Sequence, residues 1–442
     1  MGDHDVITNT DENVFRAFMQ AILNDIRAME VMLAHDMFAD TEPTMGAEQE
    51  LFILDSNYAP TTKALDILER IADDRFTTEI ALFNLEANLT PRRLTGNCFR
   101  ALEAELEEVL EIARQKAQQI DTDIVMVGIL PTLNKNHLGL SSLTPAPRYK
   151  LLNNILTKSR GGDFQVAIRG LDEMHMSHDN VLLESATNSF QLHLQVGPAE
   201  FTTLYNTAQL VAATVMAAAT NSPMLMGKRL WHETRIALFQ HAVDERSEVR
   251  QQRGHRSRVD FGSDWVKDSI VELYKEDLAE YRGLLTKPLT ENSLELAQAG
   301  QVPELSAMRL HSGTIWRWNR ACYGVKDGRA HLRIEARFLP AGPTLTDEVA
   351  NAAFFMGLMH AVPEAYGDIR QHLSFDDARA NFFNAAQVGL KAQFNWLDGQ
   401  TIPATQLILT ELLPLAYKGL EKLGVDEADR RHYLGIIEAR TR

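Results

Sequence analysis

The sequence predicts an α+β fold: a curved, mainly antiparallel sheet with a concave active-site face and helices packed on its other side. Three observations predict it. Four segments alternate apolar and polar residues with the two-residue period of strands. Longer segments carry apolar residues at helical spacing before and after these strands. No internal repeat and no linker-like tract divides the chain, which favours one continuous domain with added helices.

Helical patterns mark both ends of the chain. Residues 13–33 and 98–120 have amphipathic spacing, and the sequence becomes helical again after about residue 363, with a capping pattern from Ser374 to Asp377. We therefore expect an N-terminal helical segment over 1–40, a catalytic domain over 41–362 and a C-terminal helical region over 363–442 that packs on the domain.

Composition limits the classes of function. The net charge of −16 argues against nucleic-acid binding, and no apolar run approaches the roughly 18 residues of a membrane span. The first residues lack a signal-peptide pattern, so a cytoplasmic location is the default expectation. Two cysteines, Cys98 and Cys322, cannot build a disulfide framework. We expect no nucleic-acid or membrane partner, and a homo-oligomer stays open.

The first strand-like segment, GAEQELFIL, opens with two glutamates on one face. Glu48 and Glu50 lie two residues apart, so their side chains project from the same face about 6.6 Å apart. Buried carboxylates need compensation, because removing an ionised group from water is expensive. A cation, an arginine or water at an exposed strand end could supply it.

Three later segments repeat this design. Their polar faces carry Asn84, Glu86 and Asn88; Gln191, His193 and Gln195; and Arg333, Glu335 and Arg337. Glu79 precedes Glu86 out of phase, so it joins the same face only through a bulge or bend, and an exposed strand-edge acid is the alternative. An ordinary wet face would be rich in Lys, Thr and Ser, so four unrelated solvated strands are the weaker interpretation.

These faces predict a metal site on the sheet. The expected ligands of Mg²⁺ or Mn²⁺ are Glu48, Glu50, Glu86 and Glu335, with His193 nearby. The cation would compensate the paired glutamates of the first strand, and Arg337 would balance the remaining charge or meet a phosphate. Hard cations with arginines are typical of enzymes that handle nucleotide phosphates. The chain has no P-loop, no strand-following GxGxxG, no HExxH and no GxSxG motif.

The ordered motifs resemble the glutamate–cysteine ligase type 2 family, also called carboxylate–amine ligases. The resemblance lies in GAEQELFIL, TTEIALFNLEANLTP, PRY, SFQLHLQV, NSPMLMG followed by ETR, GTIWRWNR and RIEARFLP. It covers roughly Thr44 to Ala361. It implies the catalytic fold of glutamine synthetase and the joining of a carboxylate to an amine through an acyl phosphate, with ATP split to ADP and phosphate.

The resemblance also implies roles for single residues. Metal-binding positions fall on Glu48, Glu50, Glu86, His193 and Glu335; nucleotide-binding positions on Arg337, His193 and Gln191; catalytic positions on Arg337, Glu48 and Glu335; and substrate-pocket positions on Arg148, Arg235, Trp316 and Arg320. The chain departs from the family in three places, the first being the Glu-Gln-Glu of its first motif, which preserves the two acids on one face. Gln191 stands where some relatives have histidine, and the bulk of MLMGKRLW after NSP predicts a differently shaped pocket. For Trp316, core packing is an equal alternative.

The expected function is an ATP-dependent, glutamate–cysteine ligase-like enzyme that acts on a small carboxylate and an amine, such as two amino acids. Two alternatives stay open. One is a metal-dependent hydrolase or a phosphoryl-transfer enzyme of the guanidino-kinase type, and the other is a non-catalytic nucleotide- or metabolite-binding protein. The arginine-rich segment from Arg246 to Arg258 is a candidate lid over the acyl phosphate.

Overall fold

The computed structural model describes residue 6, residues 12–39 and residues 42–442. The remaining N-terminal residues, on which the expectation about a signal peptide partly rests, lie outside the described residues. The predicted boundary at residues 40 and 41 lies outside them as well.

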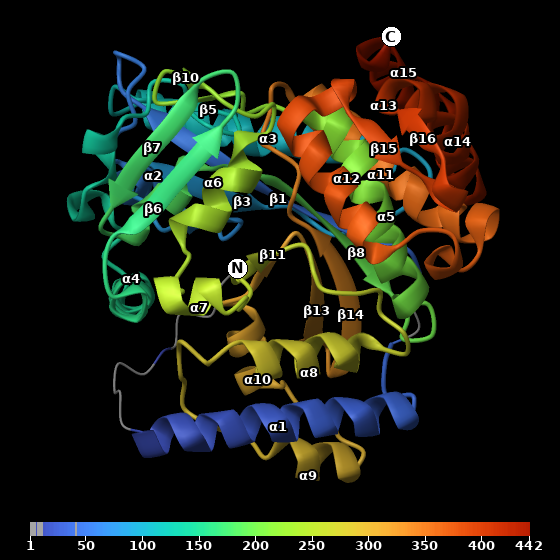
Figure 1. Cartoon of the computed structure of the whole chain (residues 1–442), viewed down its shortest axis with the longest axis horizontal. Coiled ribbons are helices and arrows are strands. Elements are labelled where there is room, and N and C mark those ends of the chain that lie inside the picture. The colour runs from blue at the N-terminus through green and yellow to red at the C-terminus, as the bar shows by residue number, and fades with distance from the viewer. Residues whose placement is uncertain (1–5, 7–11, 40–41) are drawn as a thin grey trace.

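A single large antiparallel sheet forms the centre of the protein (Figure 1). Six strands follow one another in the order β13-β14-β8-β1-β3-β2, and β4 and β5 pair with β1. Their bounds are β1 Thr44–Leu54, β2 Phe76–Thr78, β3 Asn84–Asn88, β4 Arg92–Arg93, β5 Asp123–Val125, β8 Phe190–Val196, β13 Asn319–Lys326 and β14 Arg329–Ala336. The predicted α+β fold with a curled antiparallel sheet is confirmed.

The remaining strands form two-stranded pairs. They are β6 Phe164–Arg169 with β7 Glu173–His178, β9 Met224–Leu225 with β10 Lys228–Arg229, β11 Val259–Asp260 with β12 Trp316–Arg317, and β15 Gln393–Asn395 with β16 Thr401–Pro403. The helices are α1 Glu12–Ala34, α2 Ala64–Ile71, α3 Cys98–Gln118, α4 Pro147–Arg160, α5 Phe201–Ala219, α6 Thr234–Ala242, α7 Glu248–Gln252, α8 Ile270–Glu280, α9 Ser293–Gln298, α10 Ser306–Ser312, α11 Leu345–Tyr366, α12 Phe375–Val388, α13 Ala404–Leu407, α14 Leu413–Lys422 and α15 Glu427–Thr441.

The register of the sheet brings the predicted polar faces together. Glu50 lies opposite Glu86 in the β1–β3 pair, and Glu48 lies opposite Gln191 in the β1–β8 pair. On the next strand, Glu335 lies opposite His193. The alternate residues of β8, from Phe190 to Val196, are buried, and helices α5 and α11 contact this region of the sheet. Burial of one apolar face therefore fixes the register, because a one-residue slip would turn every polar side chain into the core.

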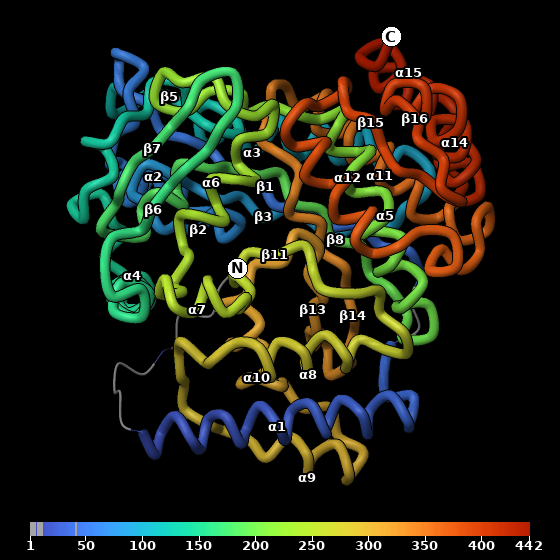
Figure 2. Tube along the Cα trace, viewed as in Figure 1, coloured from blue at the N-terminus to red at the C-terminus, as the bar shows by residue number. Residues whose placement is uncertain are grey.

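Two groups of helices lie apart from each other around the sheet. Helix α1 packs with α8, α9 and α10 along one side of the molecule, as the tube in Figure 2 shows. The C-terminal helices α12 to α15 lie on the other side, where α14 and α15 pack on α11 (Figure 1). The predicted helix over 13–33 is thus confirmed, with one more residue at each end.

The C-terminal region begins within a continuous helix. Helix α11 passes through Pro363, so the boundary predicted at residues 362 and 363 falls inside it. The predicted cap of α12 is present, since the Asp377 amide donates to Ser374 Oγ at 3.1 Å and this hydroxyl donates to the Asp377 carboxylate at 2.6 Å. Within the described residues, no helix combines the length and apolar character needed to cross a membrane.

Candidate active site

Three neighbouring strands bring Glu48, His193 and Glu335 to one point. Each side chain offers one ligand atom, and these atoms lie within 4.8 Å of one another. His193 Nε2 lies 2.9 Å from Glu48 Oε1, while the buried Nδ1 of His193 has no hydrogen-bond partner among the described residues. Carboxylates are ligands that suit Mg²⁺ or Mn²⁺, so Glu48 and Glu335 fit the predicted cation, with His193 beside them.

Glu50 already has donors from the protein. Its carboxylate accepts the Ser189 amide at 2.6 Å, the Ser189 hydroxyl at 2.9 Å and the Gln191 side-chain amide at 2.7 Å. The sequence predicts a cation beside this glutamate, and no sequence pattern reveals these three neutral donors. They hold the carboxylate in one orientation, which prepares it to meet a ligand in the cavity.

Arginines surround Glu335, which is fully buried. Arg320 Nε donates to its carboxylate at 2.6 Å, Arg337 donates to its other oxygen, and Cys322 Sγ lies 3.1 Å away. Although burial disfavours ionisation, the guanidinium groups of Arg320 and Arg337 hold the pKa of Glu335 well below its usual range. Arg337 also donates to Gln191 Oε1 at 2.6 Å, which links β14 to β8 across the site.

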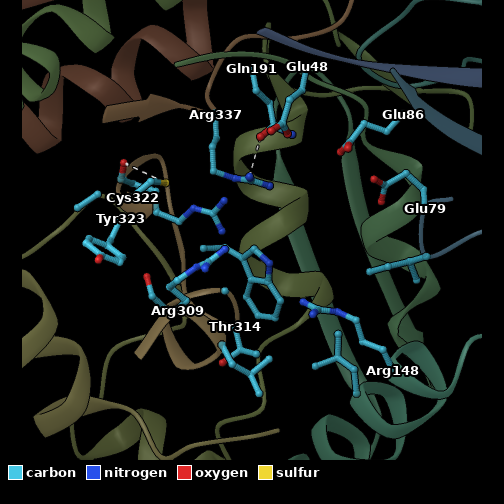
Figure 3. A pocket seen from close by; sticks show the side chains of 18 of the residues that line it. Glu48, Glu79, Glu86, Arg148, Gln191, Arg309, Thr314, Cys322, Tyr323 and Arg337 are labelled. Atoms are coloured by element: carbon cyan, nitrogen blue, oxygen red, sulfur yellow. Dashed lines mark hydrogen bonds between the residues drawn. The ribbon is translucent and has the colours of Figure 1, made fainter. Parts of the chain in front are cut away.

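A wall of carboxylates lies beside this centre. Glu50, Glu79, Glu86 and Glu184 all line the same cavity, and Figure 3 shows Glu79 and Glu86 next to each other. Glu79 lies in the bend between β2 and β3, so it reaches the face of Glu86 although its strand phase is wrong. Burial and the neighbouring carboxylates of Glu86 and Glu50 raise the pKa of Glu79 well above its ordinary value. Burial and the Glu50 carboxylate raise the pKa of Glu184 to about 8.

Crowded buried carboxylates predict a response to divalent cations. We expect Mg²⁺ or Mn²⁺ to raise the midpoint of thermal unfolding by about 3 °C or more, because a cation that binds only the folded state stabilises it. In Glu79→Gln, the cation-free protein should unfold near the wild-type temperature, since the raised pKa of Glu79 already reduces its negative charge, and the rise on adding metal should be smaller. Differential scanning calorimetry at constant ionic strength measures both. If metal raised the unfolding midpoint of Glu79→Gln as much as that of the wild type, Glu79 would not take part in cation binding, and the alternative of a strand-edge acid would hold.

The cavity in front of these acids has a volume of about 440 Å³. Of the predicted substrate residues, Arg148 from α4, Trp316 from β12 and Arg320 from β13 line it. Figure 3 shows Arg148 at the opposite end of the cavity from Glu48, Gln191 and Arg337. Trp318, two residues after Trp316, is instead buried in the core against Phe239 and Phe382. Regular strand alternation would place the two tryptophans on one face, but β12 ends at Arg317, and the chain turns Trp318 into the core before β13 begins at Asn319.

Arg235 does not lie among the described residues that line this cavity, although the family resemblance predicts it in the substrate pocket. It is buried, and its guanidinium donates to Glu233 at 3.3 Å and to the carbonyl oxygens of Phe338 at 3.1 Å and Arg337 at 3.4 Å. These contacts place it on the backbone that carries Arg337. A guanidinium can bind backbone carbonyls as well as a substrate, and the sequence alone does not distinguish the two.

Some residues that line this cavity have no role in the site that the sequence predicts. They are chiefly Glu184, Arg309 and Arg333. Arg333 was recognised on the polar face of its strand, but Glu184 lies in a short 3-10 helix, Val181–Ala186, whose sequence has no period that could reveal it. None of residues 246–258, all of which the structure describes, lines this cavity. Arg258 is buried and pairs with Glu245 at 2.8 Å, so the lid remains a prediction that the packing of Arg258 does not favour.

A second cavity of about 830 Å³ meets the first at the sheet. It has basic side chains on its walls, from Arg93, Lys326, Arg329 and Arg333, next to apolar ones from Ala39, Leu89 and Val325. His193, Gln195 and Glu48 also line it. Glu48 and Arg333 are the described residues that line both cavities. Of the other proposed metal ligands, His193 lines the second cavity, and Glu50 and Glu86 line the first.

Comparisons with known proteins agree with this geometry. The sequence model of glutamate–cysteine ligase family 2 (GCS2) matches residues 44–441. A solved glutamate–cysteine ligase from Francisella tularensis, in complex with AMP, is similar with a TM-score of 0.58 and 12% identity, over 91% of this chain and 82% of that one. A bifunctional glutathione synthetase from Pasteurella multocida has a TM-score of 0.51 and 11% identity, over 94% of this chain and 48% of that longer one. A comparison with curated protein sequences gave no match. At these identities, the solved structures show similarity of fold alone.

Proposed function

Because the chain belongs to glutamate–cysteine ligase family 2, we propose that it is an ATP-dependent carboxylate–amine ligase that forms an amide bond through an acyl phosphate. The family confirms the resemblance read from the motifs. The acyl-phosphate route and the identity of the two substrates belong to the proposal. A small carboxylate and an amine, such as two amino acids, are the expected substrates, and a γ-glutamyl-type amide is the expected product class.

The observation that carries the proposal is the meeting of two cavities at Glu48 and Arg333. A ligase of this class must bring a nucleotide and a carboxylate together from separate sites. The second cavity combines guanidinium and ammonium groups with apolar side chains, which suits a triphosphate and a base respectively. We therefore place ATP in the second cavity with its phosphates toward Glu48, and the carboxylate and amine in the first cavity.

The residues at the junction can perform the chemistry that this arrangement requires. A bound Mg²⁺ or Mn²⁺ would neutralise phosphate oxygens that repel an approaching carboxylate. Glu48, His193 and Glu335 would hold such a cation, and Glu50 and Glu86 lie on the same face for a second one. Arg337 stands beside this group and can stabilise the charge of the transferring phosphoryl group. Arg148 and Trp316 line the part of the cavity left for the organic substrates.

The experiment that tests this function is an omission assay. ADP and phosphate release would be measured with Mg²⁺ and a pool of amino acids and other small carboxylates, from which each component is left out in turn. We expect turnover that requires both a carboxylate and an amine. ADP formed without any acceptor would instead indicate a hydrolase, and ADP with a phosphorylated acceptor would indicate a kinase. Nucleotide binding without turnover in any pool would indicate a binding protein.

A further inference from the structure

The N-terminal helix α1 lies outside the residues that match the family, which begin at residue 44. It nevertheless packs against α10, and α10 supplies one wall of the 440 Å³ cavity through Ser306, Arg309, Leu310 and Ser312. Ser306 also lines a smaller cavity of about 240 Å³ between α1 and α10. Helix α10 therefore separates the substrate cavity from α1.

The start of α10 has no cap of its own. The residue at its N-cap position is Leu305, which has left-handed backbone angles and no side-chain acceptor. The first amides of a helix need acceptors, and an unsatisfied amide in a buried setting is costly. Asp25 of α1 supplies one, since its carboxylate accepts the Met308 amide at 2.9 Å and also interacts with the Ala307 amide.

Asp25 connects three segments in this way. Its other carboxylate oxygen accepts the Ser293 hydroxyl, at the first residue of α9, at 2.5 Å. The side chain is 4% exposed, so solvent does not replace these contacts. Nearby, Glu291 accepts the amides of Glu304 and Leu305 just before α10, at 3.2 Å and 3.0 Å. Carboxylates from outside the helix thus fix the whole start of α10.

The buried position of Asp25 makes its ionisation costly. Burial raises its pKa to about 6, although Ser293 and the Met308 amide oppose this shift. A carboxyl whose pKa is higher in the folded state favours folding below its ordinary pKa, and this contribution is lost as the pH rises through about 6. At neutral pH, ionisation of Asp25 therefore offsets part of the stability that its hydrogen bonds to Ser293 and Met308 contribute.

We infer that α1 shapes the substrate cavity through α10, and that Asp25 is a positioning residue. Asp25 caps α10 and so fixes the cavity wall that carries Arg309 and Leu310. The functional half of this inference rests on the proposed ligase activity. A shift of α10 would alter the first cavity while it leaves the second, nucleotide-binding cavity in place, because no described residue of α10 lines the second cavity.

The first test is hydrogen–deuterium exchange of the full chain, which needs no turnover. In Asp25→Ala, the amides of residues 306–312 should exchange about three- to tenfold faster, as expected for the loss of a helix cap, while β8 stays unchanged. Asp25→Asn should largely restore the wild-type rate, because its oxygen can accept the Met308 amide and its nitrogen can donate to Ser293. Glu30→Gln is the matched control, since Glu30 lies on the same helix and pairs with Lys275 of α8. Unchanged exchange at α10 in Asp25→Ala would overturn the inference.

The second test is kinetic. With the substrates identified by the omission assay, Asp25→Ala should raise the KM of the carboxylate or the amine about tenfold and leave the KM of ATP within about twofold, and Asp25→Asn should rescue this effect. Faster exchange with unchanged KM values would mean that α1 is only structural, which contradicts the functional half. A wild-type enzyme without ligase activity would refute the proposed function instead, and exchange alone would then decide whether Asp25 holds α10.

Discussion

Glu48→Gln is expected to lower the rate of ADP formation at least about 10³-fold while the protein stays folded. The Glu48 carboxylate lines both cavities. One of its oxygens lies within 4.8 Å of the candidate ligand atoms of His193 and Glu335. Glutamine keeps the size of the side chain and an oxygen that can bond His193, so only the negative charge is removed. A bound metal contributes several kcal/mol to phosphoryl transfer, and every ~1.4 kcal/mol corresponds to a factor of ten in rate.

Loss of metal binding can be distinguished from loss of folding as the cause of this lower rate. Electron paramagnetic resonance of Mn²⁺ should show weaker binding in Glu48→Gln, with an unfolding midpoint close to that of the wild type in metal-free buffer. Glu107→Gln provides the control, because it removes the same charge from the exposed face of α3. Wild-type turnover in Glu48→Gln would show that the Glu48 charge is not needed for catalysis, which would contradict the proposed position of the metal.

Arg337→Lys is expected to lower kcat about 10²- to 10³-fold with Mn²⁺ binding retained. Arg337 Nη1 donates to both Gln191 and Glu335, and lysine keeps the charge but lacks the planar guanidinium with its further N–H donors. Loss of one preorganised donor to a developing charge typically costs this much in rate. The variant therefore separates phosphoryl-transfer chemistry from metal binding, which Glu48→Gln does not.

Single-turnover kinetics with saturating ATP and Mg²⁺ measure this effect directly. Arg379→Lys is the matched control, since this exposed arginine of α12 pairs with Asp376 and lies outside the predicted motifs. Unchanged kcat in Arg337→Lys, or a loss that disappears at higher ATP concentration, would show that Arg337 only binds the nucleotide.

The strand-borne part of the site could be predicted from the sequence because strand side chains alternate strictly. Glu48, Gln191, His193, Glu335 and Arg337 each lie on the face opposite the apolar residues of their strand segment, and an antiparallel sheet with a fixed register then brings them together. The helix over residues 12–34 could be predicted equally well, since its apolar residues recur at helical spacing.

Side chains outside regular strands were harder to predict. Glu79 reaches the carboxylate wall through a bend, and Glu184 comes from a 3-10 helix, so neither follows a period. The role of Arg235 depends on which carbonyl groups the fold places beside it. The cap that Asp25 provides joins residues 283 positions apart, and such a contact leaves no local pattern.

The central claim, ligation through an acyl phosphate, is tested most directly by isotope transfer. The carboxylate substrate found in the omission assay would be labelled with ¹⁸O in its carboxyl group and turned over with ATP, Mg²⁺ and the amine. Mass spectrometry of the released phosphate should find an ¹⁸O atom from the carboxylate in each molecule, because the carboxyl oxygen leaves with the phosphoryl group when the amine attacks. Unlabelled phosphate, with ADP still formed, would contradict the account.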